Sequence, residues 1–182
     1  GTIAGGISGT VGSINQNCKT IGGKILVSTN HAPKNFQVGG LAGYGSFKNS
    51  ENEAEVEVVC TNQDCYGGHI YGISCSGNIQ NSINKGNITS RFDTYFETGG
   101  IGRSSIQNCI NYGDITAENL NLAEARSMRI DAGGIAGSSY SNIISNSNYG
   151  NVEVILHTEH PSCYAYIFAG GILGEGLSTI ST

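Results

Sequence analysis

The chain of 182 residues contains no tryptophan, and only 13% of its residues are charged. It has no run of 18 or more apolar residues that would predict a membrane span, and no charged segment followed by an apolar one opens it as a secretory signal would. Its 14 acidic residues outnumber the 9 basic ones, for a net charge of −5. Because nucleic-acid binding depends on neutralising phosphates, we expect no nucleic acid partner.

Glycine, asparagine and serine fill much of the remaining sequence. The chain has 28 glycines, and polar residues separate short groups of apolar residues. This composition is typical of turn-rich, all-β proteins. Low charge is also found in disordered chains, but a disordered chain would not place Ile, Val and Leu at recurring positions.

A glycine followed by Ile or Leu returns six times, and a second small residue usually follows. The copies are Gly6-Ile7-Ser8-Gly9, Gly40-Leu41-Ala42-Gly43, Gly72-Ile73-Ser74-Cys75, Gly100-Ile101-Gly102, Gly134-Ile135-Ala136-Gly137 and Gly171-Ile172-Leu173-Gly174. Successive copies are 34, 32, 28, 34 and 37 residues apart. A period of this length indicates one supersecondary unit stacked repeatedly, with repeats starting near residues 4, 38, 70, 98, 132 and 169.

Each repeat contains apolar segments of a few residues that are broken by Gly or Asn. Such segments are too short for helices and are typical of strands on successive sides of a coil. We therefore predict an all-β parallel β-helix (β-solenoid) of about five to six coils of ~33 residues, with loop or hairpin insertions along one edge. Residues 1–182 should form a single domain. Neither end resembles a polar capping repeat, so we expect a fragment of a longer protein.

The alignment of repeats predicts which positions are buried and which form turns. One apolar column should be stacked in the core: Ile14, Phe47, Ile79, Ile106 and Ile143. Gly86, Gly113 and Gly150 follow an Asn by two positions. We expect positive φ angles at these three glycines, because turns of this kind favour residues without a side chain.

Asparagine also recurs at fixed positions of the repeat. One column holds Asn52, Asn84, Asn111 and Asn148, and a second holds Asn49, Asn81 and Asn108. Stacked amides can donate to one another from coil to coil, which would satisfy polar groups buried in the coil. The alternative is that Asn simply favours turns. The register of the coils decides between the two.

These residues resemble the GLUG motif, a bacterial repeat whose Gly-Leu-x-Gly core is spelled by Gly40-Leu41-Ala42-Gly43. Copy three has Cys75 in place of the second glycine, and copy four reaches Gly102 one position early, so we expect a remodelled turn there. The resemblance implies part of a large bacterial surface or secreted protein, as in adhesin-like proteins and immunoglobulin A-cleaving metallopeptidases. In those peptidases the repeats are not the catalytic part.

Two of the six cysteines, Cys60 and Cys65, flank a short segment between two β-rich runs. A hairpin loop would hold them opposite each other, so we favour a local disulfide, with free thiols or a zinc site as alternatives. Cys18 and Cys109 share one position of the repeat but lie three coils apart. At the spacing of stacked strands they are too far apart to bond, and we expect them to fill the core as free thiols.

No catalytic, metal or cofactor motif emerges from the sequence. The segment from His157 to His160 has the wrong spacing for a metallopeptidase helix, and Pro161 follows it. Hydrolases and lyases with this fold need clustered carboxylates or a Lys or Arg base. Candidates that we expect to lie apart are Asp93, Asp114, Asp131, Arg103, Arg126 and Arg129. We expect no enzyme activity, no cofactor and no metal.

The insertions between repeats fall at one position of the coil and carry seven of the aromatic residues. These are Phe36, Tyr66, Phe92, Tyr95, Phe96, Tyr164 and Tyr166. Aromatic rings on a loop edge can stack on sugars or anchor a protein, or they can pack together as a second small core. Tyr95 and Tyr164 are our candidate ligand-binding residues, because each has a second aromatic residue nearby.

The sequence thus favours a non-catalytic repeat module of a bacterial cell-surface or secreted protein, with an adhesive, binding or stalk role. An uncharged glycan or a host protein, bound at the loop edge, is the expected partner. The alternatives are a carbohydrate-active β-helix enzyme domain and a spacer for a separate peptidase domain.

Overall fold

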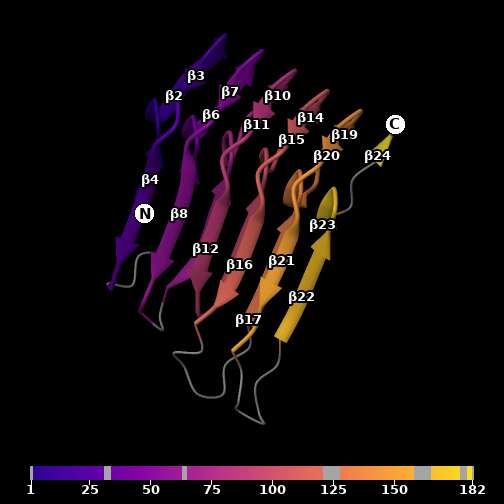
Figure 1. Cartoon of the computed structure of the whole chain (residues 1–182). Helices are drawn as coiled ribbons and strands as arrows, with labels where there is room; N and C mark the ends of the chain where they lie inside the picture. The colour runs from indigo at the N-terminus through magenta and orange to yellow at the C-terminus, as the bar shows by residue number, and fades with distance from the viewer. Residues whose placement is uncertain are drawn as a thin grey trace.

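The computed structural model describes residues 2–30, 34–62, 65–120, 128–157, 165–176 and 180–181. The chain winds as a parallel β-helix, and every strand pairing in the described residues joins equivalent parts of successive repeats in parallel. Figure 1 shows the coils side by side from the indigo N-terminal coil to the yellow C-terminal one. The predicted fold class is confirmed.

Each coil contributes one strand to each of four long sheets, which we name A to D in the order in which the chain enters them. Sheet A contains β1 (Thr2–Gly5), β5 (Lys34–Gly39), β9 (Tyr66–Tyr71), β13 (Tyr95–Gly99), β17 (Met128–Gly133) and β22 (Ala165–Gly170). Sheet B contains β2 (Ser8–Gln16), β6 (Ala42–Lys48), β10 (Ile79–Gln80), β14 (Ile106–Gln107), β19 (Ile143–Ile144) and β24 (Ile180–Ser181).

The chain then turns through the short strands of sheet C and returns along sheet D. Sheet C contains β3 (Lys19–Thr20), β7 (Glu51–Asn52), β11 (Ile83–Asn84), β15 (Ile110–Asn111) and β20 (Ser147–Asn148). Sheet D contains β4 (Lys24–Thr29), β8 (Glu55–Cys60), β12 (Ile88–Phe92), β16 (Ile115–Asn119) and β21 (Val152–Ile155). A small sheet E pairs β18 (Ala136–Ser139) with β23 (Leu173–Gly176).

The predicted apolar column is correct at four of its five positions. Phe47, Ile79, Ile106 and Ile143 are neighbours in sheet B and are buried. The prediction that Ile14 is buried is wrong, because its side chain is 63% exposed. The pairing of β2 with β6 shifts register between Thr10 and Ile14, and this shift places Asn15 opposite Phe47.

Three aromatic residues assigned to the insertions belong to the core. Phe36, Phe92 and Phe96 are fully buried between sheets A and D. The rings of Phe36 and Phe92 meet edge to face with centroids 5.5 Å apart, and those of Phe92 and Phe96 stack at 5.2 Å. For these three residues the structure confirms packing as the role of the ring.

The first asparagine column forms a continuous buried ladder inside the turn at sheet C. The side-chain nitrogen of each residue donates to the side-chain oxygen of the next, at 2.8 Å from Asn52 to Asn84, 2.7 Å from Asn84 to Asn111 and 2.8 Å from Asn111 to Asn148. Each nitrogen also donates to the carbonyl two residues ahead, on Ala54, Gly86, Gly113 and Gly150. The register therefore confirms the ladder.

A column of glycines lies against this ladder. A Cβ atom on Gly72 would lie 2.4 Å from Cγ of Asn84 and 2.1 Å from the carbonyl oxygen of Gly100. The same conflict arises at Gly40 and Gly100, where Cγ of Asn52 and Asn111 would lie 2.4 Å and 2.3 Å away. These glycines are the first residues of the repeated phrase. The phrase therefore recurs because the asparagine ladder leaves no room for a side chain at that position.

The expected positive φ angles at Gly86, Gly113 and Gly150 are wrong. These glycines are needed because the coils approach closely: a Cβ on Gly113 would lie 2.0 Å from the carbonyl oxygen of Gly86. The positive φ angles occur instead at the second asparagine column, with φ of 51° at Asn49, 48° at Asn81 and 53° at Asn108. Asn is one of the few residues with a side chain that adopts this conformation readily.

Each described strand of sheet D is followed along the chain by a strand of sheet A. A disulfide joins Cys60 at the end of β8 to Cys65 just before β9, with Cα atoms 6.4 Å apart. The predicted hairpin is wrong, because β8 and β9 belong to different sheets and the bond closes a corner between them. Among the described cysteines, Cys18 and Cys109 are unbonded.

Replacing Ile106 with Ala tests the stacked core column. We expect a loss of about 2 to 5 kcal/mol in the free energy of unfolding, because the residue is fully buried between two isoleucines. Chemical denaturation measures this loss. Gln107→Ala, at the exposed neighbouring position of β14, is the control and should change stability by about 0.5 kcal/mol or less. Equal losses in the two variants would contradict the burial of the column.

Candidate functional site

The candidate site lies where the chain leaves sheet A and turns toward sheet B. In most coils this turn is tight, because the second glycine of the phrase touches the backbone of sheet A. A Cβ on Gly43 would lie 2.5 Å from the carbonyl oxygen of Gln37, and one on Gly137 would lie 2.5 Å from that of Asp131. A side chain at this position therefore has no room in the regular coil.

The third and fourth coils depart from this rule. Bridges from Ala42 to Ser74 and from Ser74 to Gly102 put Cys75 and Arg103 at the position that Gly43 holds in the second coil. The fourth copy of the phrase is therefore not shortened, as its Gly102 suggested, but carries Arg103 at the position of the second glycine. The turn is remodelled here, as expected, and a pocket lies beside it.

The pocket encloses about 250 Å³. Two of its lining residues, Gln37 and His69, come from neighbouring strands of sheet A, β5 and β9. The others come from the turns of the third to fifth coils: Cys75, Ser76, Arg103, Ser104, Tyr140 and Ser141. Apart from the buried Cys75, the lining is polar, and Tyr140 stands at the rim with 64% of its surface exposed.

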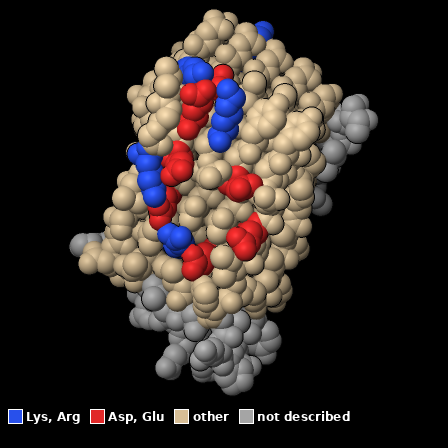
Figure 2. Space-filling model, viewed as in Figure 1, with Lys and Arg blue, Asp and Glu red and all other residues tan. Residues whose placement is uncertain are grey.

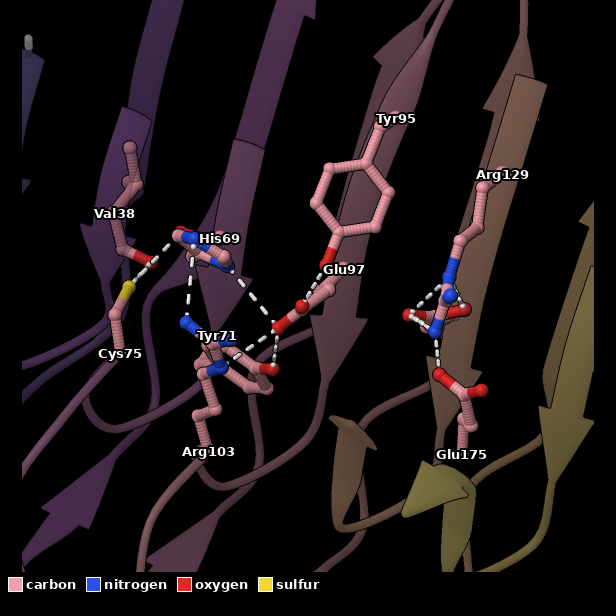
Figure 3. A network of polar contacts seen from close by, with 10 residues as sticks. Val38, His69, Tyr71, Cys75, Tyr95, Glu97, Arg103, Arg129 and Glu175 are labelled. Atoms are coloured by element: carbon pink, nitrogen blue, oxygen red, sulfur yellow. Dashed lines mark hydrogen bonds and ion pairs between the residues drawn. The ribbon is translucent and has the colours of Figure 1, made fainter. Parts of the chain in front are cut away.

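Glu97, in β13, lies at the centre of the polar network behind the pocket (Figure 3). Its side chain is only 1% exposed. Oε2 of Glu97 lies 3.1 Å from Nδ1 of His69 and 3.0 Å from Nε of Arg103. The hydroxyl of Tyr71 donates to the same oxygen at 3.3 Å, and the hydroxyl of Tyr95 donates to Oε1. Both oxygens of this carboxylate are therefore engaged.

The donors around Glu97 keep it ionised. Burial by itself raises the pKa of Glu97, but the hydrogen bond and charge of His69, the Tyr95 hydroxyl and the charge of Arg103 outweigh burial and lower this pKa to about 2. Burial and the neighbouring carboxylate raise the pKa of both tyrosines, Tyr71 and Tyr95, above the usual value. The tyrosines therefore remain neutral hydrogen-bond donors.

Tyr71 is a second departure from the repeat. It occupies the position that Gly39 and Gly99 hold in the neighbouring coils, and its side chain is fully buried. The thiol of Cys75 is buried as well, donating to the carbonyl oxygens of His69 at 2.9 Å and Val38 at 3.2 Å. Burial raises the pKa of Cys75 well above its usual range, so this cysteine is not a reactive thiolate.

A second ion pair lies one coil further along the same face of sheet A. Arg129 donates from Nε and Nη2 to the buried carboxylate of Asp131 at 3.1 Å, and it also pairs with Glu175. The Arg129 guanidinium lies 5.7 Å from the centre of the Tyr95 ring. Burial raises the pKa of Asp131 to about 6, although its bond to Arg129 acts in the opposite direction.

The structure brings together only some of the residues singled out in the sequence. Arg129 pairs with Asp131, so the expectation that the arginines and aspartates lie apart is wrong for these two. Asp114 is exposed and accepts from the backbone nitrogen of Asn151, while Asp93 is buried beside Asn119. His157 lies 3.0 Å from Glu118. Arg126 and His160 lie outside the described residues.

Of the two candidate ligand-binding residues, Tyr95 is half-buried and is held by Glu97 and Arg129 rather than free on a loop. Tyr164 lies outside the described residues. Sequence reasoning missed His69, Tyr71 and Glu97. The signal that could have found them is the loss of glycine at Tyr71, Cys75 and Arg103, in adjacent repeats.

The outer face of sheet D carries a separate band of charge, visible in Figure 2 as blue side chains beside red ones. One chain of ion pairs runs across the coils through Lys24, Glu57, Arg91, Glu118 and His157. Another, on the strands of sheet C and the turn into sheet D, links Lys19 and Lys85 through the shared carboxylates of Glu51 and Glu53. Opposite charges alternate along both of these chains of ion pairs.

No protein-family model, curated protein or solved structure matches this chain. Within the described ranges, no group of three or more His, Cys, Asp or Glu side chains is arranged to hold a metal ion. The same residues contain no helix long and apolar enough to cross a membrane.

The buried carboxylate of Glu97 predicts that the stability of the folded chain falls at acid pH, and Glu97→Gln should remove this part of the pH dependence. Because the pKa of Glu97 is about 2 in the folded chain and near 4.5 otherwise, its stabilising effect is complete above pH 4.5 and is lost as the pH falls toward 2. We expect this to account for about 3 kcal/mol of the acid-induced loss in the wild type. Urea unfolding at a series of pH values measures it.

Carboxylates outside this network respond to acid in both proteins alike, so the difference between the two pH profiles reports Glu97 together with Asp131, whose pKa Glu97 helps to raise. Asp131 has the opposite effect on the free energy of unfolding. Because its pKa is about 6 in the folded chain and 3.8 otherwise, it adds stability as the pH falls from about 6 to 3.8, and its contribution stays constant well below that range. Glu153→Gln, an exposed carboxylate of β21, is the control and should keep the wild-type profile. An unchanged profile in Glu97→Gln would show that Glu97 is not held ionised.

Proposed function

We propose that this chain is a non-catalytic binding module of a bacterial cell-surface or secreted protein, and that a glycan or a host protein binds at the pocket beside Arg103. The observation that carries the proposal is the coincidence of the pocket with the two successive coils in which the second glycine is replaced. A repeat that only spaced other domains would have no need to exchange its glycines for a buried polar network at one place.

The network supports binding because it fixes the side chains that line the pocket. His69 and Arg103 are both held by Glu97, which is itself held by two tyrosine hydroxyls. Side chains that are already ordered lose little conformational entropy when a ligand arrives. The strands on both sides of the turn also hold the pocket residues in fixed positions, which lowers the entropy cost of binding further.

The burial of the Glu97 and Asp131 carboxylates fits a binding role better than a catalytic one. Glu97 and Asp131 are neighbours in register, and their pKa values are shifted in opposite directions, a pattern that acid and base pairs of hydrolases also show. Their side chains, however, are 1% and 0% exposed. A carboxylate must reach the scissile bond to act as an acid or base, and these two face protein donors instead.

The resemblance of the repeated phrase to the GLUG motif supports a bacterial surface or secreted origin for the parent protein. The disulfide between Cys60 and Cys65 agrees with an oxidising, extracellular setting. The low charge and the continuous ladders suit an elongated module that displays a site along its side.

A binding screen on the purified chain tests this proposal. We expect the wild type to bind at least one member of a panel of bacterial and host glycans and extracellular matrix proteins. Tyr140→Ala should weaken that binding by about tenfold, because an exposed ring at the rim supplies contact area. Tyr149→Ala, which removes a ring with 68% exposure that does not line the pocket, is the matched control and should bind normally.

Absence of any binding across the panel would favour the spacer role. Binding that is lost in Tyr149→Ala but kept in Tyr140→Ala would place the site at the turn, where Tyr112 and Tyr149 stack with ring centroids 5.2 Å apart. The thermal midpoint of each variant should stay within a few degrees of the wild type, since both rings are on the surface.

A further inference from the structure

We propose that the pocket beside Arg103 recognises the carboxylate of an acidic sugar, a uronic acid unit of a polysaccharide. This inference rests on the proposed binding function and names the class of ligand for the same site. It follows from the hydrogen-bonding groups that the pocket offers and from the contacts that already engage the neighbouring carboxylate of Glu97.

Arg103 supplies the group that would hold the carboxylate. Its Nε forms an ion pair with Oε2 of Glu97 at 3.0 Å, and its Nη1 lies 3.4 Å from Nε2 of His69. The N–H groups on Nη2 have no hydrogen-bond partner among the described residues, and about a third of the side chain, 34%, remains exposed. Guanidinium groups bind carboxylates through parallel N–H donors, so a partly engaged Arg at a pocket wall suits a planar anion.

Glu97 fixes the position of the Arg103 side chain, and its carboxylate does not occupy the side of the guanidinium that faces the pocket. The carboxylate holds the guanidinium through Nε, on the sheet side of the turn, and all of its own contacts are to protein donors. Because the side chain is buried, its oxygens are not presented to the pocket. An incoming anion therefore meets the remaining N–H groups of Arg103 and not an exposed carboxylate.

The rest of the lining suits the hydroxyl groups of a sugar. Ser76, Ser104 and Ser141 provide hydroxyls that both donate and accept, and Gln37 provides an amide. Tyr140 at the rim offers an aromatic ring and a hydroxyl. The lining thus combines Arg103, with His69 beside it, and several neutral polar groups, which matches a polyhydroxylated ring that carries one negative charge.

The size of the pocket favours a single sugar unit. Its 250 Å³ falls below the roughly 300 Å³ at which sites for drug-sized ligands begin, so a whole oligosaccharide would not be enclosed. One acidic unit would enter the pocket while its neighbours along the polysaccharide continue over the exposed rim at Tyr140 and Ser141.

Titration with methyl glucuronide and methyl glucoside tests the inference, because these ligands differ only in a carboxylate in place of a hydroxymethyl group. By NMR or calorimetry we expect the wild type to bind the glucuronide at least about tenfold more tightly. Arg103→Gln should abolish this preference. Arg91→Gln, which removes an arginine from the charged face of sheet D, should keep it.

A second variant covers the case in which Arg103→Gln does not fold. Ser104→Leu leaves the bond between Arg103 and Glu97 in place but narrows the pocket, and it should weaken glucuronide binding by about tenfold. Acetate is a further ligand and should bind much more weakly than the glucuronide, because it lacks the ring.

Equal binding of the glucoside and the glucuronide, a glucuronide preference that survives in the folded arginine variant, or unchanged glucuronide binding in Ser104→Leu would overturn the inference. Equal binding of acetate would do the same, since it would reduce the site to an anion site without sugar recognition. If the panel screen finds another ligand that depends on Tyr140 while the glucuronide does not bind, the binding function stands and the uronic acid assignment fails.

Discussion

Everything in this fold depends on how closely successive coils approach at the turn through sheet C. The buried amides of Asn84 and Asn111 occupy the space in which a Cβ atom on Gly72 or Gly100 would lie. The glycines let the backbone approach, and the amides fill the space and satisfy each other and the turn carbonyls. Neither column is stable without the other, because a side chain would expel the amide and a missing amide would leave polar groups buried and unpaired.

The same constraint explains how the site arises. At the second glycine of the phrase the regular coil has no room for a side chain, so Cys75 and Arg103 are accommodated only where the turn opens. The opening creates the pocket, and a group of largely buried polar side chains lies behind it. Glu97 accepts a hydrogen bond from Tyr71 and pairs with His69 and Arg103, so these groups satisfy one another. A local departure from the repeat thus supplies both the cavity and the side chains that line it.

The sequence predicted the architecture because the repeat is a direct consequence of the packing rule. The glycines, the two asparagine columns and the isoleucines of sheet B could be aligned by position alone. Ile14 was assigned wrongly because the register shift in β2 depends on contacts across strands. The contacts around Glu97 could not be predicted, since His69, Glu97 and Arg103 meet only through stacking of different coils. The missing glycines mark the place in the repeat but do not show which side chains meet there.

The most direct test of the account compares two asparagines of the fourth coil that lie three positions apart. Asn111→Ala removes the middle of the buried ladder and should lower the free energy of unfolding by about 2 to 4 kcal/mol, because it leaves amide groups of Asn84 and Asn148 with fewer partners. Asn108→Gly removes a member of the exposed column and keeps its positive φ, so about 1 kcal/mol or less should be lost. Equal, small losses in the two variants would contradict the central role of the ladder.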